Sequence, residues 1–154
     1  MLDREKVVAA AREIIGAQKY CALVTVGVDG RPQVRTMNPF PPEDDLAVWM
    51  ATDSRCRKVQ EIRNNPNVCL YYADHREAKG YVAVSGKAVL VDDAAEKEKR
   101  KRDYWEQAFP DWEYLLLIKI IPDQLDVLHY ARDMLNAPVG WRTPSIGMGG
   151  EAAG

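Results

Sequence analysis

Residues 51–72 have the sequence ATDSRCRKVQEIRNNPNVCLYY, and they join a predicted strand to a predicted helix and then to another strand. Residues 46–52 form a predicted strand in which Leu46, Val48 and Met50 point to one face and Ala47, Trp49 and Ala51 to the other. A helix is expected from about Arg55 to Asn64, because the residue before Pro66 is unfavourable for a helix. Val68–Ala73 forms the next predicted strand. The passage from strand to helix is therefore the best-defined local feature of the chain.

The start of this helix is chemically suited to an anion. The first turn of a helix has unpaired N–H groups and the positive end of the helix dipole. Here the turn also carries the hydroxyls of Thr52 and Ser54 and three cations, Arg55, Arg57 and Lys58. Arginine can donate to two phosphate oxygens at once, while lysine acts as a point charge. Asp53 would repel an anion unless its carboxylate caps the helix, as Ser54 also can. A capped surface helix with solvated basic residues explains the same spacing, so both interpretations stay open here.

The remaining pattern predicts one antiparallel, β-rich domain. Strands are expected at 20–28 and 31–38 around the hairpin dipeptide Asp29-Gly30, at 81–91 with a bulge at Gly86, and at 115–121 and 125–130, as one bent strand or two broken at Pro122. Helices are expected at 3–15 and 92–108. Because hairpin-connected strands outnumber helices, the fold class is mainly β (α+β), an antiparallel barrel or sheet with peripheral helices. Residues 1–135 form the expected domain, and 136–154 a C-terminal tail with a disordered end.

Composition excludes several classes of protein. The chain has 154 residues, 47% of them apolar and 29% charged, which is typical of a globular domain. A formal net charge of −2 gives no basic field for nucleic acid, and acidic residues interrupt the basic run at 96–102. No apolar run is long enough to cross a membrane and no signal region is evident, so we expect a cytoplasmic protein. Three cysteines without a C-x-x-C motif and two histidines predict no metal site.

Three segments together resemble the pyridoxamine 5′-phosphate oxidase-like FMN-binding split barrels. Residues 51–72 are similar to the family's segment of Thr-Asn, Ser-Arg-Lys and Asn-Pro-x-Val. DGRPQVRTMNPF at 29–40 resembles its Gly-x-Pro-x-x-Arg strand, and YVAVSGKAVLVDD at 81–93 resembles its Val-x-Gly-x-Ala strand. The resemblance implies an antiparallel split barrel of about six strands with Greek-key connections. It also implies FMN bound at the interface of a homodimer.

The resemblance implies that two strands border the flavin. Arg35 begins the contacting segment, and Thr36 and Met37 follow it with backbone groups beside the isoalloxazine ring. Ala51 and Thr52 correspond to the pair at the end of the third strand. From the residues alone Arg35 has a second interpretation, because a charge in the middle of a strand usually faces solvent.

The same resemblance assigns the phosphate and the cover of the ring. Arg57 and Lys58 correspond to the phosphate-holding pair, and Tyr81 stands where vitamin-producing oxidases carry a flavin-contacting glutamine. Because the family's sites lie across a two-fold dimer, Trp141 of the partner chain is expected to cover the flavin. Trp105 and Trp112 are further candidates for that role. Packing in the core or at an interface is the competing interpretation for all three tryptophans.

Departures from the family pattern bear on affinity and activity. Cys56 stands where the family has serine, and Asp53 where it has asparagine, which removes a hydroxyl and adds a charge. The C-terminal Arg-x-His-Asp-Arg signature of true pyridoxamine phosphate oxidases is absent. The general stress protein-like branch therefore fits better, and vitamin synthesis is not expected.

The expected function is that of an FMN-dependent oxidoreductase passing electrons between a small-molecule donor and acceptor. No side chain stands out as a catalytic acid or base, which is consistent with the flavin doing the chemistry. A flavin carrier or stress-related sensor without turnover explains the same residues. A third alternative keeps the barrel and replaces FMN by the deazaflavin F420 or by haem.

Overall fold

A computed structural model describes residues 3–132 and 143–149. Its strands are β1 (Cys21–Val26), β2 (Pro32–Met37), β3 (Val48–Asp53), β4 (Asn67–Ala73), β5 (Gly80–Val91), β6 (Leu115–His129) and β7 (Ser145–Gly147). Its helices are α1 (Arg4–Gly16), α2 (Arg57–Asn64), α3 (Ala94–Arg100) and α4 (Trp105–Ala108), with 3-10 turns η1 (Trp112–Tyr114) and η2 (Tyr130–Arg132).

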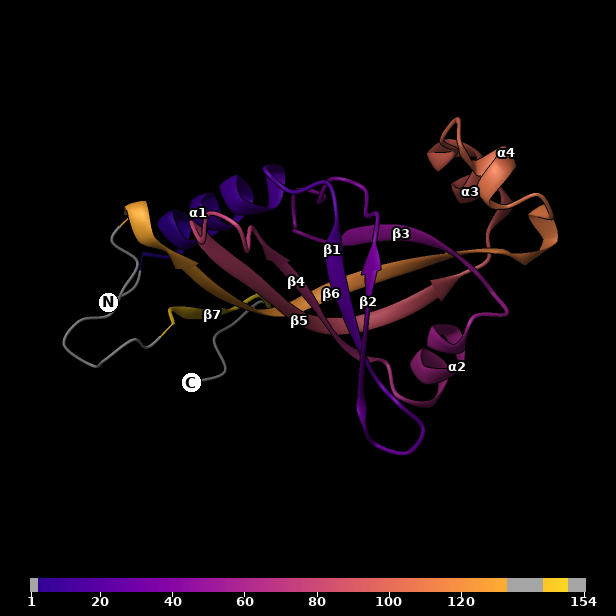
Figure 1. Ribbon diagram of the computed structural model, residues 1–154, viewed down its shortest axis with the longest axis horizontal. Helices are drawn as coiled ribbons and strands as arrows, with labels where there is room; N and C mark the ends of the chain where they lie inside the picture. The colour runs from indigo at the N-terminus through magenta and orange to yellow at the C-terminus, as the bar shows by residue number, and fades with distance from the viewer. Residues whose placement is uncertain (1–2, 133–142, 150–154) are drawn as a thin grey trace.

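The strands form one curled antiparallel sheet in the order β2-β1-β4-β5-β6-β3, which confirms the expected antiparallel fold. β2 and β3 end this order, so they form the two edges of the sheet. Figure 1 shows α1 at one end of the long strands and α3 and α4 beyond the other. α2 follows β3 and packs against β1 and β5. None of the described helices is long and apolar enough to span a membrane.

The two predicted irregularities meet at one place in the sheet. β6 is a single strand that continues through Pro122, and Pro122 pairs with Gly86 of β5. The register shifts between Ser85 and Gly86, which confirms the predicted bulge. Proline is tolerated within a sheet at such bulges because the ladder is already interrupted there.

The prediction of a single helix over 92–108 is wrong. α3 ends at Arg100, and Lys101 has an extended backbone with φ −51° and ψ 128°. The break lets Arg102 donate to the carbonyl oxygens of Asn38 and Pro39, at 3.3 and 3.1 Å. It also places Trp105, the first residue of α4, fully inside an apolar cluster. These tertiary contacts outweigh the helix-forming tendency of the intervening residues.

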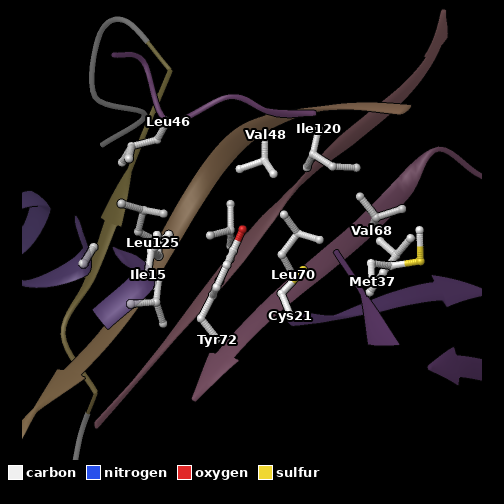
Figure 2. Close-up of a cluster of buried hydrophobic side chains, with 14 of the residues drawn as sticks. Ile15, Cys21, Met37, Leu46, Val48, Val68, Leu70, Tyr72, Ile120 and Leu125 are labelled. Carbon is white, nitrogen blue, oxygen red and sulfur yellow. The ribbon is translucent and has the colours of Figure 1, made fainter. Parts of the chain in front are cut away.

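Apolar side chains form two clusters on opposite faces of β3. The larger cluster lies inside the curled sheet, and Figure 2 shows Val48 there among residues of β4, β6 and α1. The smaller cluster contains Trp49, Trp105, Leu115 and Leu117. The predicted alternation along β3 is thereby confirmed, with both faces buried.

Part of the predicted C-terminal tail belongs to the sheet. Ile146 of β7 pairs with Leu125 of β6, and Met148 N–H donates to the carbonyl oxygen of Asp123 at 2.8 Å. The expected C-terminal tail therefore contributes a short strand to the sheet, and Gly147, where disorder was expected to begin, is the last residue of that strand. Residues 150–154 and Trp141 lie outside the described residues.

The close approach of the strands at Gly86 predicts that a larger residue there destabilises the protein. A Cβ atom at Gly86 would lie 2.1 Å from the Ile121 carbonyl oxygen, so Gly86→Ala forces the paired strands apart. We expect it to lower the free energy of unfolding by roughly 3 kcal/mol, measured by urea denaturation. Gly16→Ala is the matched control, because a Cβ there has no neighbour within 4 Å. The control should be neutral or stabilise by about 0.5 kcal/mol, and equal losses in both variants would contradict the close approach.

Candidate functional site

A cavity of about 310 Å³ lies between the two edge strands of the sheet. β2 contributes Thr36 and Met37, β3 contributes Ala51 and Thr52, and α2 contributes Lys58. All five were predicted to border one ligand, and the structure brings them together. The other wall comes from Asn38, Phe40 and the segment between Arg102 and Phe109. Of these residues, only Trp105 was predicted from the sequence, as a candidate to cover the flavin from the partner chain.

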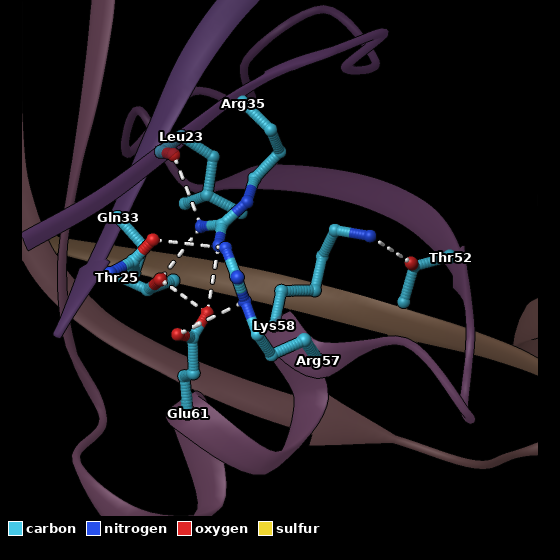
Figure 3. Close-up of polar contacts among 8 residues, drawn as sticks. All are labelled: Leu23, Thr25, Gln33, Arg35, Thr52, Arg57, Lys58 and Glu61. Atoms are coloured by element: carbon cyan, nitrogen blue, oxygen red, sulfur yellow. Dashed lines mark hydrogen bonds and ion pairs between the residues drawn. The ribbon is translucent and has the colours of Figure 1, made fainter. Parts of the chain in front are cut away.

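The Lys58 ammonium is one of two cationic groups that line this cavity, and Arg102 on the opposite wall is the other. Lys58 Nζ donates to Thr52 Oγ1 at 2.9 Å, and Thr52 is buried at the end of β3 (Figure 3). In the part of the chain that the structure describes, no carboxylate lies within ion-pair distance of Lys58. A part-buried cation with only a hydroxyl as partner favours an anionic ligand.

The start of α2 differs from the predicted cap. The N-cap residue is Cys56, which makes no side-chain hydrogen bond to the helix, so neither Asp53 nor Ser54 caps it. A thiol is a weak acceptor and leaves the first-turn N–H groups of the helix to other partners. This uncapped end adjoins the cavity through Cys56 and Lys58.

Asp53 is neutralised by its neighbour Arg55. Arg55 donates to the Asp53 carboxylate from its backbone N–H at 2.8 Å, from Nε at 3.0 Å and from Nη2 at 2.7 Å. These bonds lower the pKa of Asp53 to about 2. The Arg55 guanidinium also stacks on the Tyr114 ring at 3.8 Å, which holds it in place. The charge expected to repel a phosphate is therefore compensated within the chain.

Arg35 points into the sheet and not into solvent. Its guanidinium donates to Thr25 Oγ1 and to Glu61 Oε1, both at 2.7 Å, and to the Leu23 carbonyl oxygen at 3.3 Å (Figure 3). Glu61 is 2% exposed and also accepts from Thr25 at 3.0 Å. Arg35 does not line the cavity described above, so within one chain it joins α2 to the strands.

Arg57 and Lys58 point in different directions, although both were predicted to hold one phosphate. Arg57 Nη2 donates to Gln33 Oε1 at 3.0 Å, and Arg57 Nε lies 3.6 Å from Glu61 Oε2. Arg57 lines a separate cavity of about 440 Å³ near the β1–β2 turn. Consecutive residues of an α-helix project about 100° apart, so only one of the two faces the cavity of Lys58.

The sequence patterns did not predict that Glu61 is buried, because a glutamate on a polar helix is usually solvated. Its burial could have been inferred from its position four residues after Arg57 and beside the inward-facing Val59 and Ile62.

Tyr81 lies far from the cavity within one chain. It pairs with Leu128 of β6, whereas Thr52 pairs with Leu116, twelve residues away along the same strand. At about 3.3 Å per residue this is roughly 40 Å. Tyr81 Oη bonds Thr143 Oγ1 at 2.7 Å, and its ring lies 5.4 Å from that of Tyr71. The structure does not bring it together with the other predicted residues.

Trp105 and Trp112, two of the tryptophans proposed to cover the flavin, pack in the smaller apolar cluster. Trp105 is completely buried, with Phe40 and Phe109 in edge-to-face contact at 6.0 and 5.9 Å, so core packing is confirmed for it. Trp112 packs against the same cluster. Across residues 3–132 and 143–149, no group of three or more His, Cys, Asp or Glu side chains is arranged to hold a metal ion.

Comparison with known proteins places this arrangement in context. The sequence model of the family described as "Pyridoxamine 5'-phosphate oxidase" matches residues 7–128. General stress protein 26 of Bacillus subtilis is 28% identical over 133 residues, which covers 83% of this chain and 92% of that protein.

Solved structures share the fold. A protein of Clostridium acetobutylicum related to general stress protein 26 superposes with a TM-score of 0.75 at 18% identity, over 95% of this chain and 96% of that one. An FMN-binding protein of Nostoc punctiforme related to pyridoxamine 5′-phosphate oxidase gives 0.66 at 18% identity, over 94% and 95%. A heme-binding protein of Mycobacterium smegmatis gives 0.69 at 12% identity, over 96% and 60%. These likenesses confirm the split-barrel fold.

The pairing of Asp53 with Arg55 is testable by titration. Arg55→Gln removes the side-chain donors, so we expect the pKa of Asp53 to rise from about 2 towards the ordinary aspartate value, which is about 3.9. NMR titration of the carboxyl carbon measures it. Arg57→Gln is the control and should leave this pKa unchanged. An Asp53 pKa that stays low in Arg55→Gln would show that another group neutralises the carboxylate.

Proposed function

Because the chain belongs to the pyridoxamine 5′-phosphate oxidase family, we propose that it is a flavoprotein that binds FMN in the cavity between β2 and β3. The observation that carries the proposal is the Lys58 ammonium, held by Thr52 at the uncapped start of α2. A phosphate at this point would receive a cation, a hydroxyl and the first-turn N–H groups of a helix.

The residues present fit a phosphate ester. Lys58 supplies a positive charge with no described carboxylate at ion-pair distance, and Arg55 compensates the charge of Asp53. Thr36, Met37 and Ala51 then border the remainder of the ligand. The cavity volume of about 310 Å³ is at the lower end of small-molecule sites, so part of a flavin would extend beyond it.

Bound FMN would supply the hydride and electron-transfer chemistry between a reductant and an acceptor. The chain's own residues bind and orient it: Lys58 and Thr52 at the phosphate, Thr36 and Met37 beside the ring. The described cavity contains no histidine, and its carboxylate is Asp53, which is paired with Arg55. We therefore assign no side chain of this cavity as a proton donor. Consumption of NADH or NADPH with a panel of acceptors distinguishes an oxidoreductase from a flavin carrier or sensor.

FMN suits this cavity better than haem. The haem of globins and peroxidases is held by a proximal histidine, and neither His75 nor His129 lines the cavity. His129 is buried elsewhere, with Nε2 3.2 Å from Glu13 Oε1. Mass spectrometry of the ligand extracted from the purified protein identifies FMN, F420 or haem directly.

We further propose that the protein is a homodimer and that the partner completes the cofactor site. The outward face of β1 and β2 is apolar, with Val24 paired to Val34 and Val26 to Pro32. Val34 is 66% exposed in the single chain. Contact between two such faces would bury these side chains. It would also provide the means for Tyr81 of the partner subunit to approach a cavity that Tyr81 cannot reach in its own chain.

The phosphate assignment predicts unequal effects of two neighbouring substitutions. Lys58→Gln removes the ammonium at the start of α2 that would meet the phosphate, so we expect FMN affinity to fall by about 10- to 100-fold. Arg57→Gln is the matched control, because Arg57 faces Gln33 and Glu61, and it should change FMN affinity by less than about threefold. Flavin fluorescence titration measures both.

Riboflavin separates phosphate binding from ring binding. Riboflavin lacks the phosphate, so its affinity should be nearly the same in the native protein and in Lys58→Gln. Failure of the native protein to bind FMN would overturn the proposed function. If Lys58→Gln lowered the affinities for FMN and riboflavin equally, Lys58 would not be the residue that binds the phosphate.

The dimer predicts a separate result. Val34→Glu places a charge on the apolar face of β2, so we expect it to give a folded monomer by light scattering with weakened FMN binding. Val28→Glu is the control, since Val28 is 73% exposed in the turn between the strands. A monomeric native protein, or a dimeric Val34→Glu, would contradict this interface.

A further inference from the structure

Another cavity, of about 380 Å³, adjoins the first cavity, the one between β2 and β3, and we call it the second cavity. Its lining has a different chemical character. Its apolar lining consists mainly of Ile15, Phe40 and three prolines, Pro39, Pro41 and Pro42. Its charged lining residues are Lys19 and Arg102, and no aspartate or glutamate lines it. An apolar cavity with cations and no acid favours a ligand that has an apolar body and a negative charge.

Arg102 is held rigidly by neutral groups. Its guanidinium stacks on the Phe40 ring at 3.8 Å. Nη1 donates to the Asn38 carbonyl oxygen at 3.3 Å and to Tyr104 Oη at 3.1 Å, and Nη2 donates to the Pro39 carbonyl oxygen at 3.1 Å. Asn38 Nδ2 also donates to Tyr104 Oη at 3.2 Å, which fixes that hydroxyl. The planar group is therefore positioned before any ligand arrives.

Two N–H groups of Arg102 remain available. A guanidinium carries five N–H donors in a fixed fork, and the three bonds above leave Nε–H and one Nη2–H without an acceptor among the described residues. Nε and Nη2 lie on one edge of the group, which is the edge that receives both oxygens of a carboxylate.

The charge of Arg102 is also uncompensated. Three other arginines near the two cavities have carboxylate partners: Arg35 pairs with Glu61, Arg55 with Asp53, and Arg100 with Glu43 and Glu96. No described carboxylate lies within ion-pair distance of Arg102. A positioned cation of this kind binds an anion without first losing an internal ion pair.

We propose that this second cavity binds a small organic acid with a flat apolar body, whose carboxylate bonds to the open edge of Arg102. The body packs against Phe40 and the prolines, and Lys19 at the exposed side adds positive charge. Asn38, Phe40, Arg102 and Tyr104 line both cavities, so the acid lies beside the ligand of the first. Its binding stands independently of the flavin, whereas a role as the flavin's substrate rests on the proposed function.

The test uses benzoate as the probe and benzamide as its neutral counterpart of the same shape. Calorimetry on the purified full chain should show benzoate binding at least about tenfold tighter than benzamide. Arg102→Gln should reduce benzoate affinity by about tenfold or more and leave benzamide unchanged. Arg102→Lys keeps the charge but loses the fork, so an intermediate affinity is expected. Lys6→Gln, on the exposed side of α1 and outside the cavity, is the control for net charge.

Arg102 also supports the wall between the cavities, so its variants are first checked by circular dichroism. If Arg102→Gln does not fold, Lys19→Gln replaces it, because Lys19 is exposed and should lower benzoate affinity by about threefold. Equal binding of benzoate and benzamide, or benzoate binding that survives loss of the charge, would overturn the proposal.

Flavin binding is measured in the same samples. Benzoate binding with no FMN binding would refute the proposed function and leave the acid site intact. FMN binding with no benzoate binding would refute the acid site and leave the proposed function intact. If both bind, benzoate should shift the absorbance spectrum of bound flavin, because the two cavities share a wall.

Discussion

The buried ion pair between Arg35 and Glu61 determines how α2 lies against the sheet. Glu61 comes from the helix, Arg35 from β2 and Thr25 from β1, and their side chains meet where water is largely excluded. Removing one member of such a pair typically costs about 3–5 kcal/mol, because the other charge is left buried. Since α2 is rotated to present Glu61 inward, Lys58 must face the cavity and Arg57 must face the β1–β2 turn. The orientation of the helix therefore sets the position of the cation on which the proposed phosphate site depends.

The opposite wall of the site depends on the interruption between α3 and α4. A continuous helix would carry Arg102 and Trp105 along one axis, away from residues 38–40. The break instead lets Trp105 fill the second apolar cluster while Arg102 stacks on Phe40. Burial of a large aromatic side chain outweighs the loss of a few helical hydrogen bonds. One irregular segment thus closes the first cavity and separates it from the second.

The charges around the site follow a consistent pattern. Most arginines of this region are neutralised within the chain, as Arg55 is by Asp53 and Arg35 by Glu61. Lys58 and Arg102 have only neutral partners among the described residues. These two cations line a common cavity, from α2 on one side and from the wall of residues 38–40 and 102–104 on the other. Within this cavity, Lys58 and Arg102 are therefore the two cations that an anionic ligand could pair with.

Local signals in the sequence determined most of the fold. Alternating apolar residues located the strands, Asp29-Gly30 located the hairpin, Gly86 located the bulge, and the segment around Ser54 to Pro66 indicated the family. These features depend on neighbours a few residues away, so a linear pattern is sufficient to reveal them. The linear pattern, however, assigned Arg57 and Lys58 to the same phosphate and predicted one helix over 92–108. It also gave no sign that Glu61 is buried or that β7 joins the sheet. Those outcomes depend on contacts between residues distant in the chain. Only the tertiary structure decides them, because the free energy of burying a charge or an aromatic ring depends on which groups surround it.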